Sequence, residues 1–210
     1  MKTEQREFTA GNGWESITDK NLGEAANLVL AFGGRETMTD PARFDEIRGY
    51  YPNATILTGS TAGEILDVEV KDDSISCTAI QFEHTTLKVS STAIGVKGNS
   101  FETGQYLAED LLSDDLVHIF VLSDGLNVNG SELVKGFNDK LPDGISVTGG
   151  LAGDKADFGS TLVGMDHAPG EGGIIAIGFY GDRLKVGYGS IGGWDSFGPE
   201  RSVTKSKENV

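Results

Sequence analysis

The chain has little cysteine and little positive charge. Its one cysteine, Cys77, cannot form a disulfide within the chain, which fits a reducing compartment. Because Cys77 lies in a strand-like apolar stretch, we expect a small buried hydrophobic side chain rather than a reactive thiol. The 17 basic residues are outnumbered by 32 acidic ones, and the formal net charge is −15. Such a charge argues against nucleic acid and anionic membranes as partners, because phosphates would be repelled.

Long apolar runs are also missing. No run approaches the roughly 18 residues that a membrane-spanning helix needs. The N-terminal segment MKTEQREFTAGNGWES has no apolar stretch of the kind found in a secretory signal. Together with the single cysteine, these absences predict a cytoplasmic protein that does not associate with membranes.

Familiar catalytic and metal-binding motifs are absent as well. No histidine or cysteine pair has the spacing of a metal site, and no glycine-rich loop carries the Lys-Ser/Thr pair of a P-loop. The sequence GSTAG (59–63) resembles the nucleophile elbow of hydrolases, with Thr61 at its centre. No Ser/His/Asp set accompanies it, so we predict a protein that is not an enzyme. A hydrolase with Thr61 as nucleophile is the catalytic alternative, and it needs a base within hydrogen-bond reach of Thr61.

What the sequence does contain is an internal repeat. Residues 52–64 (PNATILTGSTAGE) return 90 positions later as residues 142–154 (PDGISVTGGLAGD). Residues 76–95 align in the same way with residues 173–192, and eight of the twenty pairs are identical. A period of this length is not that of a solenoid. We therefore predict one duplicated domain with a pseudo-two-fold axis. Its repeats are expected at about residues 26–95 and 116–192.

The apolar pattern predicts the same elements in both repeats. Each has a strand, a helix and a second strand, which form a βαβ unit with parallel strands. Each then closes with two strands joined by a short link, which predicts an antiparallel hairpin. In repeat one these elements are the strand 26–32, a helix opened by Asp40-Pro41, the strand 54–59 and the hairpin strands 75–82 and 86–94. In repeat two they are the strand 117–123, the helix 131–140, the strand 145–150 and the hairpin strands 173–179 and 183–191.

These elements predict an α/β fold made of pseudo-two-fold duplicated βαβ-plus-hairpin units, with mixed β-sheet(s) flanked by helices. A further helix is expected before each repeat, at residues 101–112 and near residues 14–24. The expected organisation is an N-terminal extension and helix (1–25), one domain (26–202) and an exit toward a further C-terminal domain (203–210). The pattern leaves open whether the strands form one long sheet or two.

The candidate site lies in the loops that follow the strands, because ligands of parallel α/β sheets bind at the carboxyl ends of the strands. These loops are rich in small residues, whose backbone N–H groups can hold an anion. Arg35 could bind a carboxylate and the acidic side chains an ammonium group, which suits a small zwitterion such as an amino acid. The expected ligand-binding residues are Arg35, Ser60, Thr61, Glu64, Asp124, Asp154, Trp194 and Phe197.

A plainer interpretation of the same residues stays open. The glycines can simply shape the turns, and the acidic side chains can cap helices or bind water. Trp194 and Phe197, in the segment GGWDSFGP (192–199), can line a pocket or fill the end of the core.

The three histidines bear on haem, because a haem protein usually needs an axial ligand. His118 lies within an apolar strand, which favours a hydrogen-bonded core histidine. His84 falls in a turn that we expect to be exposed, and His167, in the loop MDHAPGEGG, is the most accessible of the three. The sequence therefore leaves the cofactor unknown, with haem as one alternative.

Four segments together resemble a known family, the FIST N-terminal domain of F-box and intracellular signal transduction proteins. They are GSTAGEI (59–65), GGLAGDKADF (149–158), GGWDSFGP (192–199) and VTKS (203–206), and the resemblance runs from about residue 26 to residue 206. It implies a cytoplasmic, bacterial sensory domain that binds small ligands such as amino acids, or in some members haem. It also implies a C-terminal FIST-type partner domain and an output protein such as a histidine kinase, a diguanylate cyclase or a chemoreceptor. The family provides no settled catalytic residues.

The leading hypothesis is thus a non-enzymatic, intracellular domain that senses a small ligand. A haem-binding gas sensor and a protein-interaction scaffold without a small ligand are its two rivals. The scaffold predicts an exposed apolar patch and loops whose interiors are filled. The ligand, the output partner and the oligomeric state are not determined by the sequence.

Overall fold

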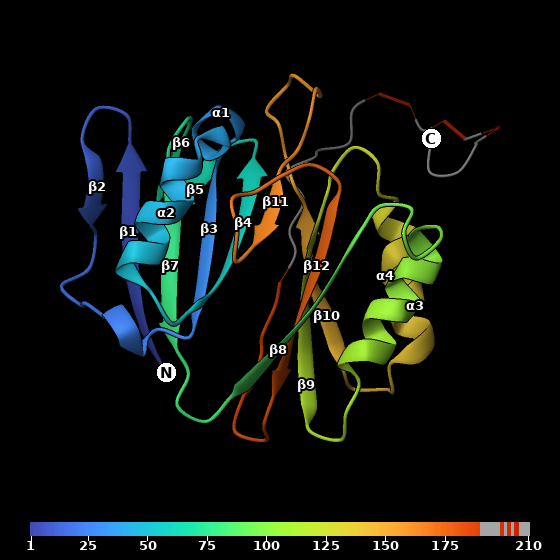
Figure 1. Ribbon diagram of the computed structural model, residues 1–210. Helices are drawn as coiled ribbons and strands as arrows, with labels where there is room; N and C mark the ends of the chain where they lie inside the picture. The colour runs from blue at the N-terminus through green and yellow to red at the C-terminus, as the bar shows by residue number, and fades with distance from the viewer. Residues whose placement is uncertain (190–197, 200, 203, 206–210) are drawn as a thin grey trace.

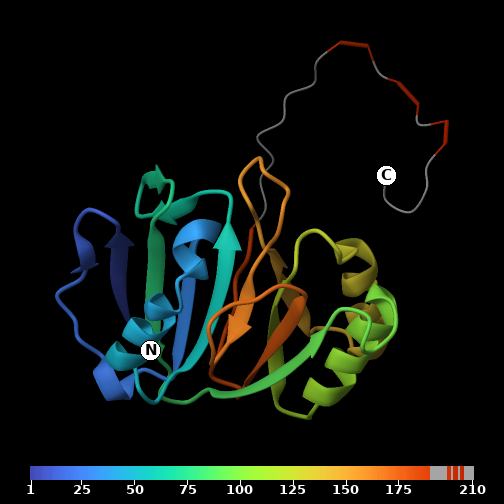
Figure 2. The ribbon, with the colours of Figure 1, turned by 45° about the horizontal axis from the view of Figure 1, so that its top comes forward.

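The computed structural model describes residues 1–189, 198–199, 201–202 and 204–205. Two β-sheets face each other, and helices cover their outer sides (Figures 1 and 2). The α/β class predicted from the sequence is confirmed, and the strands form two main sheets rather than one. No helix in this part of the chain is both long and apolar enough to cross a membrane.

The first sheet has six strands in the order β11–β4–β3–β7–β1–β2. Its strands are β1 Lys2–Thr9, β2 Gly13–Ser16, β3 Leu28–Gly34, β4 Thr55–Thr61, β7 Ile75–Gln81 and β11 Val163–Met165. The second sheet has the order β10–β9–β12–β8, with β8 Thr86–Ala93, β9 Leu116–Ser123, β10 Ser146–Leu151 and β12 Gly173–Tyr180. A separate hairpin consists of β5 Glu64–Leu66 and β6 Glu69–Lys71. The helices are a 3-10 turn Gly23–Ala25, α1 Arg35–Thr39, α2 Pro41–Tyr50, α3 Ser100–Leu111 and α4 Gly130–Lys140.

Three apolar clusters hold these layers together. The alternation of side chains along β3 sends Val29 and Ala31 toward α2, whereas Leu28 packs into the core between the sheets. Strand β9 does the same, with Ile119 packed against α3 and α4 and Leu122 between the sheets. The fold is therefore a four-layer stack of helix, sheet, sheet and helices. Strands β3, β9 and β12 are continuous apolar runs because both of their faces are covered.

The two sheets share one arrangement, of which the sequence predicted the parallel pairs. In each, a parallel pair (β3 with β4, β9 with β10) is bordered on the other side by an antiparallel strand, β7 or β12. The expected helices 101–112 and 131–140 are confirmed as α3 and α4. Helix α2 begins as expected, with Asp40 as N-cap and Pro41 in the first turn.

The predicted closing hairpins are wrong in both repeats. Strand β7 lies in the first sheet and β8 in the second, so the two never pair. The short link between them crosses from one sheet to the other, and β8 pairs with β12 instead. Residues 183–189, expected to pair with β12, form no strand in the described part of the chain. Residues 183–189 cannot pair with β12 because β8 already occupies that edge of the strand.

The predicted helix near residues 14–24 is also wrong. Residues 1–25 form β1, β2 and the 3-10 turn, and β1 pairs with β7 along seven residues. Its sequence KTEQREFT alternates in the manner of a strand, and Phe8 and Trp14 pack on the cluster beneath α2. The segment expected to be an extension is thus part of the first sheet.

Cys77 and His118 occupy the core positions that the sequence predicts. Cys77 is fully buried on β7, and burial raises the pKa of its thiol to about 12. A thiol held in its neutral form is a small hydrophobic group rather than a nucleophile.

Candidate functional site

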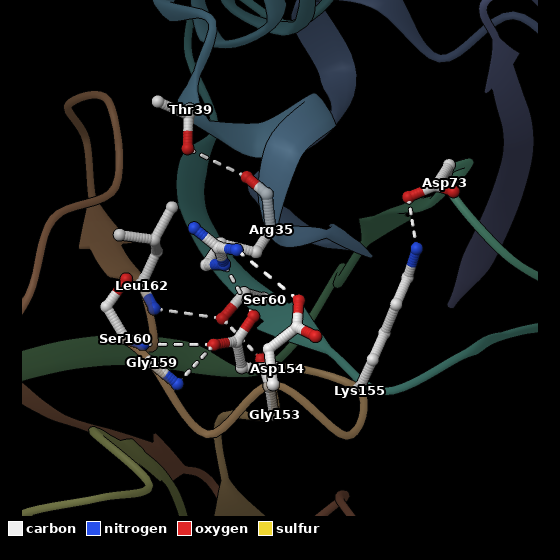
Figure 3. Close-up of polar contacts among 11 residues, drawn as sticks. Arg35, Thr39, Ser60, Asp73, Gly153, Asp154, Lys155, Gly159, Ser160 and Leu162 are labelled. Atoms are coloured by element: carbon white, nitrogen blue, oxygen red, sulfur yellow. Dashed lines mark hydrogen bonds and ion pairs between the residues drawn. The ribbon is translucent and has the colours of Figure 1, made fainter.

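The two repeated turns meet at the carboxyl ends of β4 and β10. Gly153 N–H donates to the carbonyl of Ser60 at 2.8 Å. The Ser60 hydroxyl donates to the carbonyl of Gly153 at 2.8 Å and accepts from Leu162 N–H at 2.9 Å (Figure 3). A Cβ on Gly153 would lie 2.8 Å from the Ala62 nitrogen, so only glycine permits this approach. Segments about 90 residues apart in the sequence are therefore in direct contact. We call this contact between residues 59–64 and 149–154 the joint.

Arg35 and Asp154 form the ion pair at the centre of this joint. Arg35 Nε donates to Asp154 Oδ1 at 2.5 Å, and Asp154 Oδ2 accepts from the N–H groups of Gly159 and Ser160 at 2.9 Å (Figure 3). The bond from Ser160 lowers the pKa of Asp154, burial opposes this, and Arg35 lowers the pKa further. The carboxylate is therefore charged and has its oxygens occupied by the protein itself.

Thr61 and Glu64 form a second pair within the first turn. The Thr61 hydroxyl donates to Glu64 Oε1 at 2.6 Å, and Glu64 Oε2 accepts from the backbone and side chain of Ser74. A base thus lies within reach of Thr61, which is what the hydrolase alternative requires. However, the Glu64 side chain is buried, and neither of the two cavities described below is lined by Thr61. The hydrogen bond between Thr61 and Glu64 therefore stabilises the turn that contains both residues.

Asp124 organises the loop after β9. Its Oδ1 accepts from the N–H groups of Leu126 and Asn127, and its Oδ2 accepts from the hydroxyl of Thr161 and the N–H of Gly172. Burial by itself raises the pKa of Asp124, but these hydrogen bonds outweigh it and leave the pKa below the usual range. The ionised Asp124 side chain therefore links this loop to the 161–172 segment through hydrogen bonds.

A cavity of about 890 Å³ opens beside this loop, at the carboxyl ends of β9 and β10. We call it the helix-end cavity, because the first turns of α3 and α4 line it. Its residues are Ile94, Gly95, Gly98, Asn99, Ser100, Phe101, Thr103, Gly125, Leu126, Asn127, Val128, Asn129, Glu132, Leu151 and Ile174.

Helices α3 and α4 run in parallel, so both present their N-termini to the cavity. The hydroxyl of Ser100 accepts from Asn129 N–H at one end, and Lys140 pairs with Glu109 at the other. Asn99 and Asn129 cap the two helices by accepting from the N–H three residues on. The positive ends of both helix dipoles therefore face the same space.

The sequence did not identify the residues of the helix-end cavity. A signal for them exists, because Asn99 and Asn129 each precede a glutamate by three residues, the spacing of a capping box. Asp124 is the only expected ligand-binding residue in the loop that lines this cavity, and it lies at the base of that loop. Arg35, Ser60, Thr61, Glu64 and Asp154 gather at the joint instead, while Trp194 and Phe197 lie outside the described residues.

The histidines occupy three different settings. His118 is 3% exposed, and its two ring nitrogens lie 2.8 and 2.9 Å from the hydroxyls of Ser146 and Thr148. An axial bond to iron from His118 requires one of these contacts to break. His84 and His167 are exposed, as expected, and His167 Nδ1 lies 2.8 Å from the carbonyl of Ala168.

Comparison with known proteins adds one match. The family model described as the FIST N domain matches residues 27–210 of the chain. A search of curated proteins found no match.

Proposed function

Because the chain belongs to the FIST N domain family, a family of signal-transduction sensory domains, we propose that it senses a small zwitterion such as an amino acid. The helix-end cavity is the observation that carries this proposal. It has the size of a small-molecule site and lies where α/β folds place their ligands, at the carboxyl ends of parallel strands.

The chemistry of the cavity fits the two charges of an amino acid. The α-carboxylate would lie at the N-termini of α3 and α4, where two aligned helix dipoles favour an anion. Glu132 Oε1 accepts from Lys135 Nζ at 2.6 Å, and the other oxygen of this carboxylate, Oε2, would take the ammonium group. Leu126, Val128 and Leu151 offer apolar surface to the remaining side chain of the ligand.

The joint between the turns provides a route for the signal. The loop that lines the cavity is tied by Asp124 to Thr161, and the same segment continues to Leu162, which is bonded to Ser60 of the first sheet. We therefore give Ser60, Asp124 and Asp154 positioning roles rather than ligand contacts. A ligand that binds one arrangement of this joint more tightly would shift the population toward it.

A thermal-shift screen of amino acids and simple carboxylates tests the proposal. A ligand at one hundred times its Kd is expected to stabilise the domain by about 2.7 kcal/mol. Leu151→Trp, which enlarges a side chain on the wall of the cavity, should reduce the shift. Val134→Trp places the same side chain on an exposed position of α4 outside the cavity and should leave the shift intact.

Glu132→Gln tests the contribution of the ligand's ammonium group to binding separately from that of its carboxylate. It should weaken amino-acid binding by roughly tenfold, about 1.4 kcal/mol, but leave carboxylates without an ammonium group unaffected. The proposal fails if no amino acid stabilises the domain, or if Leu151→Trp responds like the unmodified protein.

One observation favours the scaffold as a second candidate. Ile65, Val68 and Val70 are 71%, 90% and 73% exposed on the β5–β6 hairpin, which projects beyond the edge of the first sheet (Figure 2). Clustered apolar side chains of this kind mark protein contacts. The scaffold predicts that no small molecule shifts the melting temperature, and that hairpin amides become protected from hydrogen exchange only when a partner protein is bound.

A further inference from the structure

A second cavity, of about 310 Å³, lies between the two sheets, at the end where β3 begins. We call it the inter-sheet pocket. Its residues are Met1, Leu28, Leu30, Ile80, Phe82, His118, Phe120, Thr148, Phe179, Leu184, Lys185, Val186 and Gly187. Leucine, isoleucine and phenylalanine side chains of both sheets form most of the wall, and Phe82 and Phe179 meet edge to face at 5.8 Å.

Two neutral polar groups interrupt this apolar wall. His118 Nε2 lies 2.9 Å from the Thr148 hydroxyl, and His118 Nδ1 lies 2.8 Å from the hydroxyl of Ser146. Burial lowers the pKa of His118, so the imidazole is uncharged near neutral pH. A hydroxyl can rotate to donate or to accept, so Thr148 can offer a ligand either half of a hydrogen bond. Lys185 is the charged side chain of the lining and is exposed.

The outer wall of the pocket is a segment without sheet pairing, residues 184–187, which we call the roof segment. Leu184 N–H bonds to the carbonyl of Gly181, and the segment belongs to no strand. Its first three residues, Leu-Lys-Val, are identical to residues 87–89 of β8, which pair fully with β12. The same sequence is thus fixed by sheet pairing in β8, whereas in the roof segment it has the turn hydrogen bond of Leu184 and side-chain packing but no sheet pairing. Moving the roof segment breaks no sheet hydrogen bond.

We propose that the inter-sheet pocket binds a small uncharged molecule with an apolar ring and one hydrogen-bonding group, such as a phenol, beneath the roof segment. The wall favours an apolar ring, and the Thr148–His118 pair satisfies a single polar group. The charged groups of the lining residues, the Lys185 side chain and the Met1 α-ammonium, belong to exposed residues, so a charged ligand would have to give up its hydration against the apolar wall. The volume, at the small end of ligand pockets, fits one or two fused rings and excludes a macrocycle such as haem unless the sheets separate.

Binding at this site controls the segment that follows β12. A ligand adds contacts to Leu184 and Val186, so the occupied pocket holds the roof segment in place more firmly than the empty one. This second sensing site is independent of the helix-end cavity, which shares no lining residue with it.

Calorimetric titration with p-cresol, toluene and benzoate tests the ligand class. We expect p-cresol to bind, toluene to bind more weakly because it lacks the hydroxyl, and benzoate not to bind. Leu184→Ala should weaken p-cresol binding by about tenfold or more. The matched control is Leu87→Ala, the corresponding leucine of the β8 copy, which lies outside the pocket and should leave the Kd unchanged.

Two further readouts separate this proposal from the others. Bound p-cresol should slow tryptic cleavage after Lys185, whereas benzoate should not. Leu151→Trp, which alters the wall of the helix-end cavity, should leave p-cresol binding unchanged, so failure of one site does not count against the other. The proposal would be overturned by binding of benzoate as tightly as p-cresol, by equal effects of Leu184→Ala and Leu87→Ala, or by a haem Soret band that His118→Gln abolishes.

Discussion

At the scale of single residues, the buried carboxylates of this domain fasten loops. Glu64, Asp124 and Asp154 each accept several hydrogen bonds from neighbouring backbone or hydroxyl groups. The sequence correctly placed these acids at the carboxyl ends of the parallel strands, because each follows a predicted strand. Their partners could not be predicted, since Ser160 and Thr161 come from a segment with no recognisable pattern. Only folding brings that segment onto the joint.

Acid should destabilise the protein in two stages. The pKa of His118 is lowered on folding, so its stabilising effect is complete above the unfolded value of about 6.5 and is lost as pH falls from there toward the folded pKa. The lowered pKa values of Asp124 and Asp154 add a second loss, which begins near the unfolded value of about 3.9 and continues through the folded pKa values.

Urea unfolding at a series of pH values measures both stages. The slope in the upper stage cannot exceed about 1.4 kcal/mol per pH unit, because a single proton is involved. His118→Gln should remove the upper stage and keep the lower one. A variant with both stages unchanged would contradict this assignment.

At the scale of elements, the contact between α3 and α4 decides where the helix-end cavity forms. Gly104 and Gly136 face each other, and a Cβ at either position would lie 2.2 or 2.1 Å from a carbonyl of the other helix. The two helix axes therefore come close enough for both N-termini to border one cavity. The sequence predicted both helices from their apolar positions, but it could not predict that they run in parallel and in contact.

Gly104→Ala should destabilise the domain by about 1–2 kcal/mol, because the steric cost exceeds the gain in helix propensity. Gly49→Ala provides the control, since Gly49 lies in α2 and a methyl group added there would meet no atom within 4 Å. There the same change should stabilise by about 0.5–1 kcal/mol. Chemical denaturation compares the two, and a loss of stability in both variants would show that the helix contact is not the cause.

At the scale of the whole molecule, each sheet contains a strand from the other half of the sequence. Strand β8 lies in the first repeat but pairs with β12, and β11 lies in the second repeat but pairs with β4. Leu28 and Leu57 of the first sheet share one core with Leu122 of the second. Neither half can therefore complete its own sheet or bury its inner face alone.

The domain should accordingly unfold in one cooperative transition. In a Trp194→Phe background, fluorescence of Trp14 reports the first sheet, where its indole N–H donates to Glu46. Far-ultraviolet circular dichroism reports the helices of both layers, and α3 and α4 beside the second sheet hold the larger share. The two curves should have the same midpoint in urea, and separate midpoints would show that the halves fold independently.

The sequence by itself determined the α/β class, the parallel pairs, three of the helices and the buried states of Cys77 and His118. Apolar periodicity and capping residues act within a few residues of chain, so they can be recognised without a structure. The tertiary structure alone decided that β8 pairs with β12 in the second sheet, that β1 belongs to the first sheet, and where the two cavities form. These depend on which strand occupies a sheet edge and which side chains leave a space unfilled. Both are outcomes of competition between segments far apart in the chain, and no local pattern records them.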